Sequence, residues 1–71
     1  MYRELKALRV KHNITQKQIA KILGITPEAY SNKETGKYNF TLEEALKISL
    51  LFGLPVEDIF KEKIIQLNKE V

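Results

Sequence analysis

Apolar residues recur at helical spacing along this chain, and Gly, Pro and Asn interrupt the pattern at short intervals. Near the beginning, Leu5 and Leu8 lie among Lys and Arg residues, which predicts an amphipathic helix over residues 2–12. Asn13 tolerates the left-handed backbone conformation and is expected to end this helix. The pattern therefore favours short helices that each bury one face.

Two helices with clear start and stop signals are predicted next, over residues 16–23 and 27–34. A threonine precedes each of them, and its side-chain oxygen can accept from a free backbone N–H group in the first turn. A glycine follows each helix, because glycine adopts a positive φ without steric penalty. The signals are, in chain order, Thr15 with Gln18 as a capping box, Gly24, Thr26 with Pro27 at the first helical position, and Gly36.

A longer helix is predicted after Thr41, and a short one over residues 56–60. The longer helix carries acidic residues in its first turn and a broad apolar face, so we expect it to be the core helix. Its apolar residues are Leu42, Ala45, Leu46, Ile48, Leu51 and Phe52. Helical and extended conformations both fit the apolar pattern of residues 61–71, so the conformation of this tail stays open.

The length of the chain indicates one small domain, and every element predicted above up to residue 60 is a helix. We place it at residues 1–60 of the 71, followed by a C-terminal tail over residues 61–71. The sequence has no cysteine and one histidine, His12, which we expect at an exposed helix end; no disulfide, metal site or cofactor is expected. No secretory signal or membrane-spanning stretch is evident, so the expected location is the cytoplasm.

Positive charge is concentrated in the first half of the chain. Residues 1–38 hold eight Lys and Arg residues against three acidic ones, a net charge of +5. Residues 39–71 hold four Lys residues against six acidic ones, a net charge of −2. A polyanion such as nucleic acid would dock on the cationic half. By itself, however, the asymmetry also fits an ordinary solvated surface.

The short link between the second and third predicted helices defines a motif. Only three or four residues around Gly24 separate them, which forces the helices to cross steeply, as in a helix-turn-helix. The apolar face of the second helix is predicted from Ile19, Ala20, Ile22 and Leu23. The residues expected to face the first and fourth helices are Ile19, Leu23, Ile25 and Tyr30. The third helix keeps short or polar residues outside, and these suit hydrogen bonding to base edges and phosphates.

Two stretches of the sequence resemble the phage Cro and repressor type helix-turn-helix family, also called the xenobiotic-response-element family. The first stretch runs from Thr15 through Gly24 to Thr26 and continues over residues 30–37, and the second covers residues 51–60. The resemblance extends over about residues 1–60. It implies an all-α, five-helix lambda-repressor-like DNA-binding domain with a short C-terminal extension.

The resemblance also implies roles for individual residues. Gln16 would contact phosphate and brace the first recognition residue, and the third helix would read bases through Pro27, Glu28 and Asn32. Arg9 and Glu34 would form a structural ion pair. The implied DNA-binding residues, including the loop that grips the DNA backbone, are Gln16, Lys17, Thr26, Pro27, Glu28, Ser31, Asn32, Thr35, Lys37, Tyr38 and Asn39.

Three residues depart from the family pattern. Pro27 stands where a polar base-reading residue is usual, so it either contacts a thymine methyl group or only shapes the start of the helix. Lys33 replaces an apolar residue, and we expect its amine to extend along the core edge toward water or phosphate. Phe40 replaces a proline and is expected to dock its loop on the core.

Several candidate residues also have ordinary structural explanations. Glu28 serves the positive end of the helix dipole more readily than it reads cytosine. Tyr30 fits the core better than base stacking, whereas Tyr38 is the better candidate for DNA contact. Glu43 and Glu44 diverge on a helix and form no acid–base pair. No nucleophile with a base and an acid emerges, so no enzymatic activity is expected.

These features favour a sequence-specific transcriptional regulator, most simply a repressor, that places residues 27–34 in the major groove of double-stranded DNA. A homodimer on two half-sites is expected, because one small domain buries too little surface for tight binding. Its contact is predicted from the last helices and the tail, through Leu54, Ile59, Ile64, Ile65 and Leu67. No small-molecule ligand is expected at this length.

The alternative interpretation is a helix-turn-helix protein-interaction module that has lost DNA binding. Basic charge on the recognition side discriminates the two, since DNA binding predicts an affinity that falls steeply with salt. Within the DNA-binding interpretation, the roles of prophage regulator, antitoxin and restriction controller share this fold and all stay open.

Overall fold

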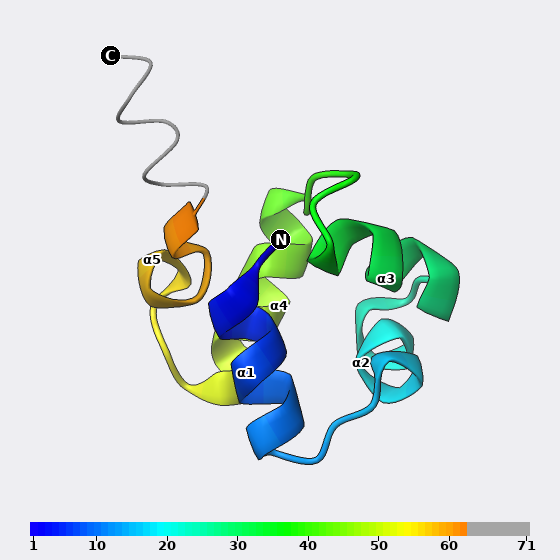
Figure 1. Ribbon diagram of the computed structural model, residues 1–71. Helices are drawn as coiled ribbons and strands as arrows, with labels where there is room; N and C mark the ends of the chain where they lie inside the picture. Colours follow the sequence, from blue (N-terminus) through cyan, green and yellow to red (C-terminus); the bar gives the residue numbers. More distant parts are fainter. Residues whose placement is uncertain (63–71) are drawn as a thin grey trace.

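The computed structural model describes residues 1–62, in which five helices surround one core (Figure 1). They are α1 (Arg3–Lys11), α2 (Gln16–Leu23), α3 (Pro27–Glu34), α4 (Leu42–Phe52) and α5 (Val56–Ile59). In Figure 1, α2 and α3 occupy one side of the molecule and α5 the opposite side, with α1 and α4 between them. Residues 1–62 contain no strand, so the predicted all-α, five-helix fold is confirmed.

The local signals that bound α2, α3 and α4 act as predicted. The hydroxyl oxygens of Thr15, Thr26 and Thr41 accept from the backbone N–H group three residues later, at 3.0–3.1 Å. The capping boxes of α2 and α4 are complete, because Gln18 and Glu44 accept in return from the N–H of their cap residue. Residues with positive φ follow α1, α2 and α4, at Asn13, Gly24 and Gly53.

Every helix contributes a side chain with no exposed surface to the core. These side chains are Leu5, Ile19, Tyr30, Ile48 and Ile59. The expectation that Ile59 lies in a dimer contact is therefore wrong, because α5 uses this residue to close the core. Leu54 is half-buried and packs against the same core, while Ile64, Ile65 and Leu67 lie outside the described residues.

Three aromatic rings join the beginning of the chain to its later segments. Tyr2, Phe40 and Phe60 form a triangle in which ring centroids lie 5.3–5.4 Å apart and the rings meet edge to face. Phe40 also lies 6.0 Å from the ring of the buried Tyr30. The predicted docking of the loop through Phe40 is thus confirmed, and the triangle holds the loop between α3 and α4 against the core.

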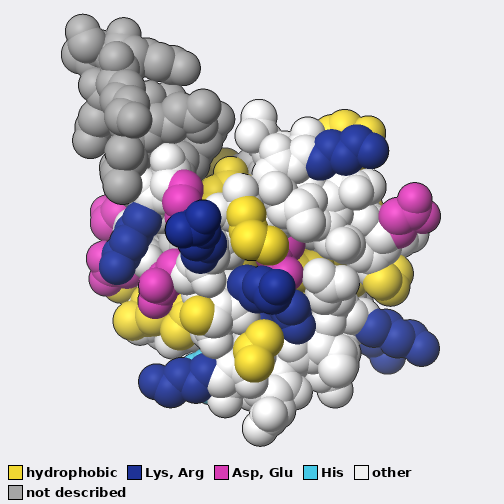
Figure 2. Space-filling view, viewed as in Figure 1, with side chains coloured by type: hydrophobic (Ala, Val, Ile, Leu, Met, Phe, Trp, Pro, Cys, Tyr) yellow, Lys and Arg dark blue, Asp and Glu magenta, His cyan; other side chains and the backbone are white. Residues whose placement is uncertain are grey.

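Other apolar side chains are exposed, contrary to prediction, and hydrophobic side chains are visible on the face shown in Figure 2. Leu42, Leu46 and Leu51 on α4 were expected in the core but are 74%, 50% and 38% exposed, and Ile22 on α2 is 48% exposed. Successive helical residues point about 100° apart, so a helix that is apolar on most sides cannot bury all of them against one core.

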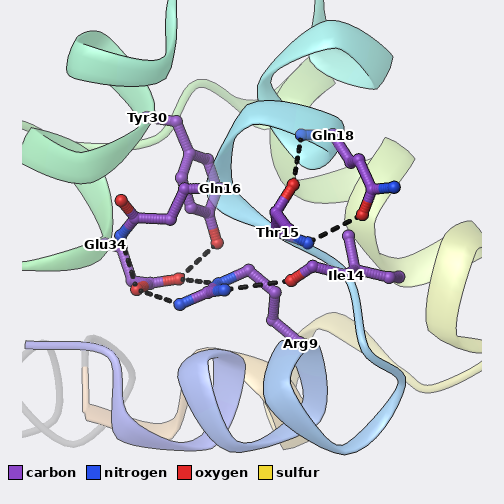
Figure 3. A network of polar contacts seen from close by, with 7 residues as sticks. All are labelled: Arg9, Ile14, Thr15, Gln16, Gln18, Tyr30 and Glu34. Carbon is purple, nitrogen blue, oxygen red and sulfur yellow. Dashed lines mark hydrogen bonds and ion pairs between the residues drawn. The ribbon is translucent and has the colours of Figure 1, made fainter.

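A buried carboxylate, that of Glu34 at the end of α3, connects three helices (Figure 3). From α1, Arg9 donates through Nε to Oε2 over 2.9 Å and through Nη2 to Oε1 over 3.2 Å. From α2, Gln16 donates to Oε1 over 3.2 Å, and within α3 the Tyr30 hydroxyl donates to Oε2 over 2.6 Å. Arg9 also donates to the carbonyl of Ile14 over 3.0 Å, which holds the turn before α2.

The preceding residue, Lys33, ties α3 to α4. Its amine lies 2.7 Å from both carboxylate oxygens of Glu44, and the two side chains are only 16% and 9% exposed. The expectation that this amine extends toward water or phosphate is therefore wrong, because a carboxylate in the first turn of α4 lies within reach. Neighbouring residues of opposite charge thus hold the end of α3 from two sides.

Burial and hydrogen bonding act in opposite directions on these carboxylates. Burial alone would raise the pKa of Glu34, but the hydrogen bonds from Arg9 and Tyr30 outweigh it and hold the pKa below its usual value. The pKa of Glu44 is lowered for the same reason, with Lys33 as the main donor against burial. Burial and the bond to Glu34 raise the pKa of the Tyr30 hydroxyl, which stays protonated and donates.

Removing one member of the buried pair is expected to cost more than removing both. Arg9→Met leaves the Glu34 charge buried without its cation, which should lower the free energy of unfolding by about 3–5 kcal/mol. The double variant Arg9→Met/Glu34→Leu leaves no uncompensated charge and should be more stable than Arg9→Met. Urea unfolding followed by circular dichroism measures both. A double variant no more stable than the single one would contradict this explanation.

The lowered carboxylate pKa values predict that the fold is sensitive to acid. In the unfolded chain the pKa of a Glu side chain is about 4.3, and in the folded chain the pKa values of Glu34 and Glu44 are lower. Their contribution to stability is complete above the unfolded pKa and is lost as the pH falls through the folded pKa. Thermal melting should therefore be constant above about pH 5 and fall below it. Glu34→Gln should show a smaller fall, and an unchanged fall would contradict the assignment.

Candidate nucleic-acid interface

The residues with implied DNA-binding roles lie on α2, on α3 with its cap residue, and in the loop that follows α3. In Figure 1, α2 and α3 are on the right and the loop is at the top. We call this set the recognition surface. Gln16, Ser31 and Asn32 are half-buried, and the other members are exposed. The full set is Gln16, Lys17, Thr26, Pro27, Glu28, Ser31, Asn32, Thr35, Lys37, Tyr38 and Asn39.

The first turn of α3 presents three different chemical groups to solvent. The Thr26 hydroxyl oxygen accepts from the N–H of Ala29 over 3.1 Å, which leaves the hydroxyl hydrogen available to a further acceptor. Pro27 occupies the first helical position, where a missing N–H costs nothing, and its ring is exposed. Glu28 is also exposed in this turn. The turn therefore combines an apolar ring, a carboxylate and a hydroxyl group.

Asn32 fixes the loop after α3 through its backbone. Its carbonyl oxygen accepts from the N–H groups of Lys37 at 2.9 Å and Tyr38 at 3.2 Å, and from the Thr35 hydroxyl at 3.2 Å. The loop therefore folds back onto the helix that precedes it. Its exposed side chains consequently keep a defined position relative to the outer side of α3.

Gly36 allows this loop to turn beside the beginning of the chain. It has φ +91°, and a Cβ atom there would lie 3.1 Å from the backbone nitrogen of Met1. The N–H of Tyr2 also donates to the carbonyl of Glu34 over 2.9 Å. The segment before α1 thus supports the end of α3 and the loop together. Beyond this turn, the Lys37 amine lies 5.7 Å from the ring centroid of Tyr38.

Gln16 contacts a different part of α3 from the one that the resemblance implies. Its amide nitrogen donates to Glu34, at the C-terminal end of α3, whereas the implied bracing contact lies at the start of that helix. Its side chain is half-buried at the beginning of α2, next to the exposed Lys17. The structure therefore places Gln16 within the polar network of Figure 3 as well as at the edge of the recognition surface.

Internal pairing reduces the number of cations that can face a polyanion. Arg9 and Lys33, two of the eight cations in residues 1–38, are held by Glu34 and Glu44. Exposed lysines on α2 and in the loop after α3 keep their charge at the surface: Lys17, Lys21 and Lys37. On the face shown in Figure 2, most acidic side chains gather on the side of α5, away from α2 and α3.

Two contacts that position the site escape sequence reasoning. The Lys33–Glu44 pair joins residues on different helices, and only the capping role of Glu44 has a local signal, the threonine three residues before it. The anchoring of the loop depends on the main chain of Asn32, which no side-chain pattern reveals. Across residues 1–62, no group of three acidic or histidine side chains is arranged to hold a metal ion. No helix in that part is long and apolar enough to cross a membrane.

Comparison with known proteins agrees with this architecture. A sequence model of the helix-turn-helix family matches residues 5–59. The chain is 43% identical over 60 residues to an uncharacterized HTH-type transcriptional regulator of Methanocaldococcus jannaschii, an alignment that covers 84% of this chain and 91% of that protein. It is 42% identical over 60 residues to an uncharacterized HTH-type transcriptional regulator of Archaeoglobus fulgidus, with 84% of each chain covered.

A bacterial protein shows a weaker similarity over the same length. The chain is 32% identical over 60 residues to the uncharacterized HTH-type transcriptional regulator YgzD of Bacillus subtilis, which covers 84% of this chain and 91% of that protein. The match to the family model spans all five helices except the first two residues of α1. Together with the short turn that joins α2 to α3, these matches show that the chain belongs to the Cro and repressor type helix-turn-helix family.

Proposed function

We propose that this protein is a sequence-specific DNA-binding transcriptional regulator, most simply a repressor, that inserts α3 into the major groove. The observation that carries the proposal is the division of α3 into two sides. Lys33 and Glu34 hold the inner side through ion pairs, while the outer side presents exposed or half-exposed polar groups. A helix held in this way offers base contacts with little loss of conformational freedom on binding.

Asn32 is the best candidate for direct base contact. Its carbonyl anchors the loop, and within residues 1–62 no hydrogen bond engages its side-chain amide. A free amide can bind adenine bidentately through N6 and N7 in the major groove. Pro27 would contact a thymine methyl group, and Glu28 would accept from a cytosine amine if it serves more than the helix dipole.

The remaining members of the recognition surface would bind the DNA backbone. Hydroxyl, amide and ammonium groups position a protein on DNA through phosphate contacts that carry no sequence information. The proposed phosphate contacts come from the start of α2, from α3 and its cap, and from the loop after α3: Gln16, Lys17, Thr26, Ser31, Thr35, Lys37, Tyr38 and Asn39. Of these, Thr26 and Ser31 lie beside the base-reading residues and would touch either phosphate or bases.

We propose that the protein acts as a homodimer and represses by steric exclusion. One domain of this size buries little surface on DNA, and a dimer doubles the contact over two half-sites about one helical turn apart. A dimer bound in this way over a promoter would block polymerase. The named relatives are called transcriptional regulators, which supports the regulatory role without specifying its sign.

Selection of bound duplexes from a random pool tests the proposal directly. The expected result is enrichment of an inverted repeat whose half-sites are centred about 10 base pairs apart. Binding to any duplex should weaken steeply with salt, because phosphate contacts release counterions. No enrichment, together with no binding to random duplex at low salt, would favour a protein-interaction module instead.

Asn32→Ala is expected to relax the preference at one base position of each half-site. The loss should be about 1–3 kcal/mol of discrimination at that position, with little change at the others. Competition binding with single-base variants of the selected duplex measures it. Asn39→Ala is the matched control in the loop, and it should weaken all duplexes alike. The opposite pattern in the two variants would mean that the assigned register of α3 is wrong.

Lys37→Ala is expected to weaken binding to all sequences by a similar factor. It should also reduce the slope of log K against log salt by about 0.9, since one phosphate contact is lost. Lys61→Ala is the matched control, because Lys61 is exposed and closely follows α5, the helix on the side of the molecule opposite α2 and α3. Fluorescence anisotropy at several salt concentrations gives both slopes. Equal slopes for the two variants would exclude Lys37 from the phosphate contacts.

A further inference from the structure

An apolar stripe runs along the outer side of α4. Leu42, Leu46 and Leu50 are four residues apart, a spacing that places them on one side of the helix. They are 74%, 50% and 83% exposed, so together they expose the equivalent of about two whole leucine side chains. We call these three residues the leucine stripe.

The leucine stripe has no function within the domain core. The other side of α4 packs inward through Ala45 and Ile48, and each helix already contributes a fully buried side chain to the core. Monomeric proteins scatter their exposed apolar residues, and a contiguous apolar surface rimmed by polar residues marks an interaction site. The stripe is therefore a surface that needs a partner.

We propose that the leucine stripe is the surface through which two copies of this chain pair, α4 against α4 in antiparallel orientation, with Leu46 on the twofold axis. The inference names the dimer surface of the proposed regulator and in that sense rests on the proposed function. It replaces the predicted contact through α5, whose Ile59 is buried in the core.

The spacing of the leucine stripe makes it self-complementary. A twofold axis through Leu46 places Leu42 of each copy opposite Leu50 of the other, because both lie four residues from the centre. Helix axes in such contacts lie about 8–10 Å apart, which suits interdigitated leucines. Every leucine of the stripe thereby gains an apolar neighbour, and the contact closes with two copies.

Charges beside the leucine stripe favour the antiparallel orientation. Glu43 and Lys47 flank one side of the stripe, are 81% and 44% exposed, and lie 3.6 Å apart. In an antiparallel pair the same flanks of both helices meet, so Glu43 of each copy comes near Lys47 of the other. A parallel pair would instead bring this flank against Ser49, whose hydroxyl already donates to the carbonyl of Leu54 over 2.6 Å. The antiparallel contact therefore has an apolar centre and a charge-matched rim.

The position and size of the leucine stripe suit a dimer that assembles on DNA. It begins at Leu42, three residues after Asn39 in the loop of the recognition surface, so pairing joins two such surfaces closely. A single pair of helices of this length buries less than standard interfaces do, which predicts dissociation in the micromolar range, on the order of 1–100 μM. Simultaneous contact with two half-sites would strengthen the pairing.

Disulfide cross-linking tests the geometry directly, because the chain has no cysteine. Leu46→Cys is expected to cross-link to itself rapidly, since the two Cα atoms face each other across the axis. Leu42→Cys alone should not, because its copies lie about 12 Å apart along the helices, beyond disulfide reach. A mixture of Leu42→Cys and Leu50→Cys should cross-link. Val10→Cys, on α1 and 57% exposed, is the control and should not.

Sedimentation of the full chain without DNA gives the second test. Leu46→Glu should weaken dimerisation at least tenfold relative to Val10→Glu, with an unchanged helical circular dichroism spectrum. Equal dimerisation of the two variants, or self-cross-linking of Leu42→Cys without that of Leu46→Cys, would overturn the proposal. So would a wild-type chain that stays monomeric at about 100 μM.

Failure of this dimer surface and failure of the proposed function give different results. A chain that cross-links as predicted but binds no duplex keeps the dimer surface and loses the regulatory role. A chain that binds an inverted repeat but dimerises unchanged in Leu46→Glu keeps the regulatory role and loses this surface.

Discussion

The buried carboxylate of Glu34 is the contact on which the orientation of α3 depends. A helix of eight residues is too short to be stable alone, so packing must supply both its stability and its direction. Apolar contacts supply stability but tolerate small rotations of the helix. The carboxylate of Glu34 accepts four hydrogen bonds from Arg9, Gln16 and Tyr30, and these directed bonds do not tolerate such rotations. Burying the Glu34 carboxylate without partners would be costly, so the folded state depends on the hydrogen-bond network. The network in turn forms only when the fold brings α1, α2 and α3 together.

Three consecutive residues of α3 have different roles, because each side chain points about 100° away from the one before it. Asn32 faces the recognition surface and anchors the loop through its carbonyl, Lys33 reaches α4, and Glu34 reaches α1 and α2. The residue proposed to contact bases is thus adjacent to the two that fix the helix. Glu44 is acidic but buried, and it holds α3 through Lys33 while it caps α4. Because its charge is paired with that of Lys33, it does not oppose the binding of an anionic ligand to the proposed DNA-binding surface.

The sequence predicts the parts of this structure that local chemistry decides. Thr15, Thr26 and Gly24 bound their helices through contacts within a few residues, so the pattern predicts α2 and α3 themselves. The family resemblance, not the pattern, is what assigns the recognition surface to these helices and the following loop. The predictions for Leu46, Ile59 and Lys33 are wrong because contacts between distant parts of the chain decide where these side chains lie. Leu46 is on a helix that is apolar on most sides, so the pattern does not show which side faces the core. Ile59 closes the core from a helix of only four residues, and the partner of Lys33 is eleven residues away in the sequence. The DNA contacts themselves stay a prediction.

The central claim is that α3, held by Glu34, forms the DNA-binding surface, and amide chemical shifts test it most directly. Isotope-labelled protein would be titrated with the selected duplex, and the shifts of every backbone N–H and of the Arg9 side-chain Nε–H would be followed. The largest changes are predicted at the start of α2, over residues 26–32 and over residues 35–39, with the side chain of Arg9 unchanged because its network is already formed. Changes centred on α1 or α5, with α3 unaffected, would contradict the account.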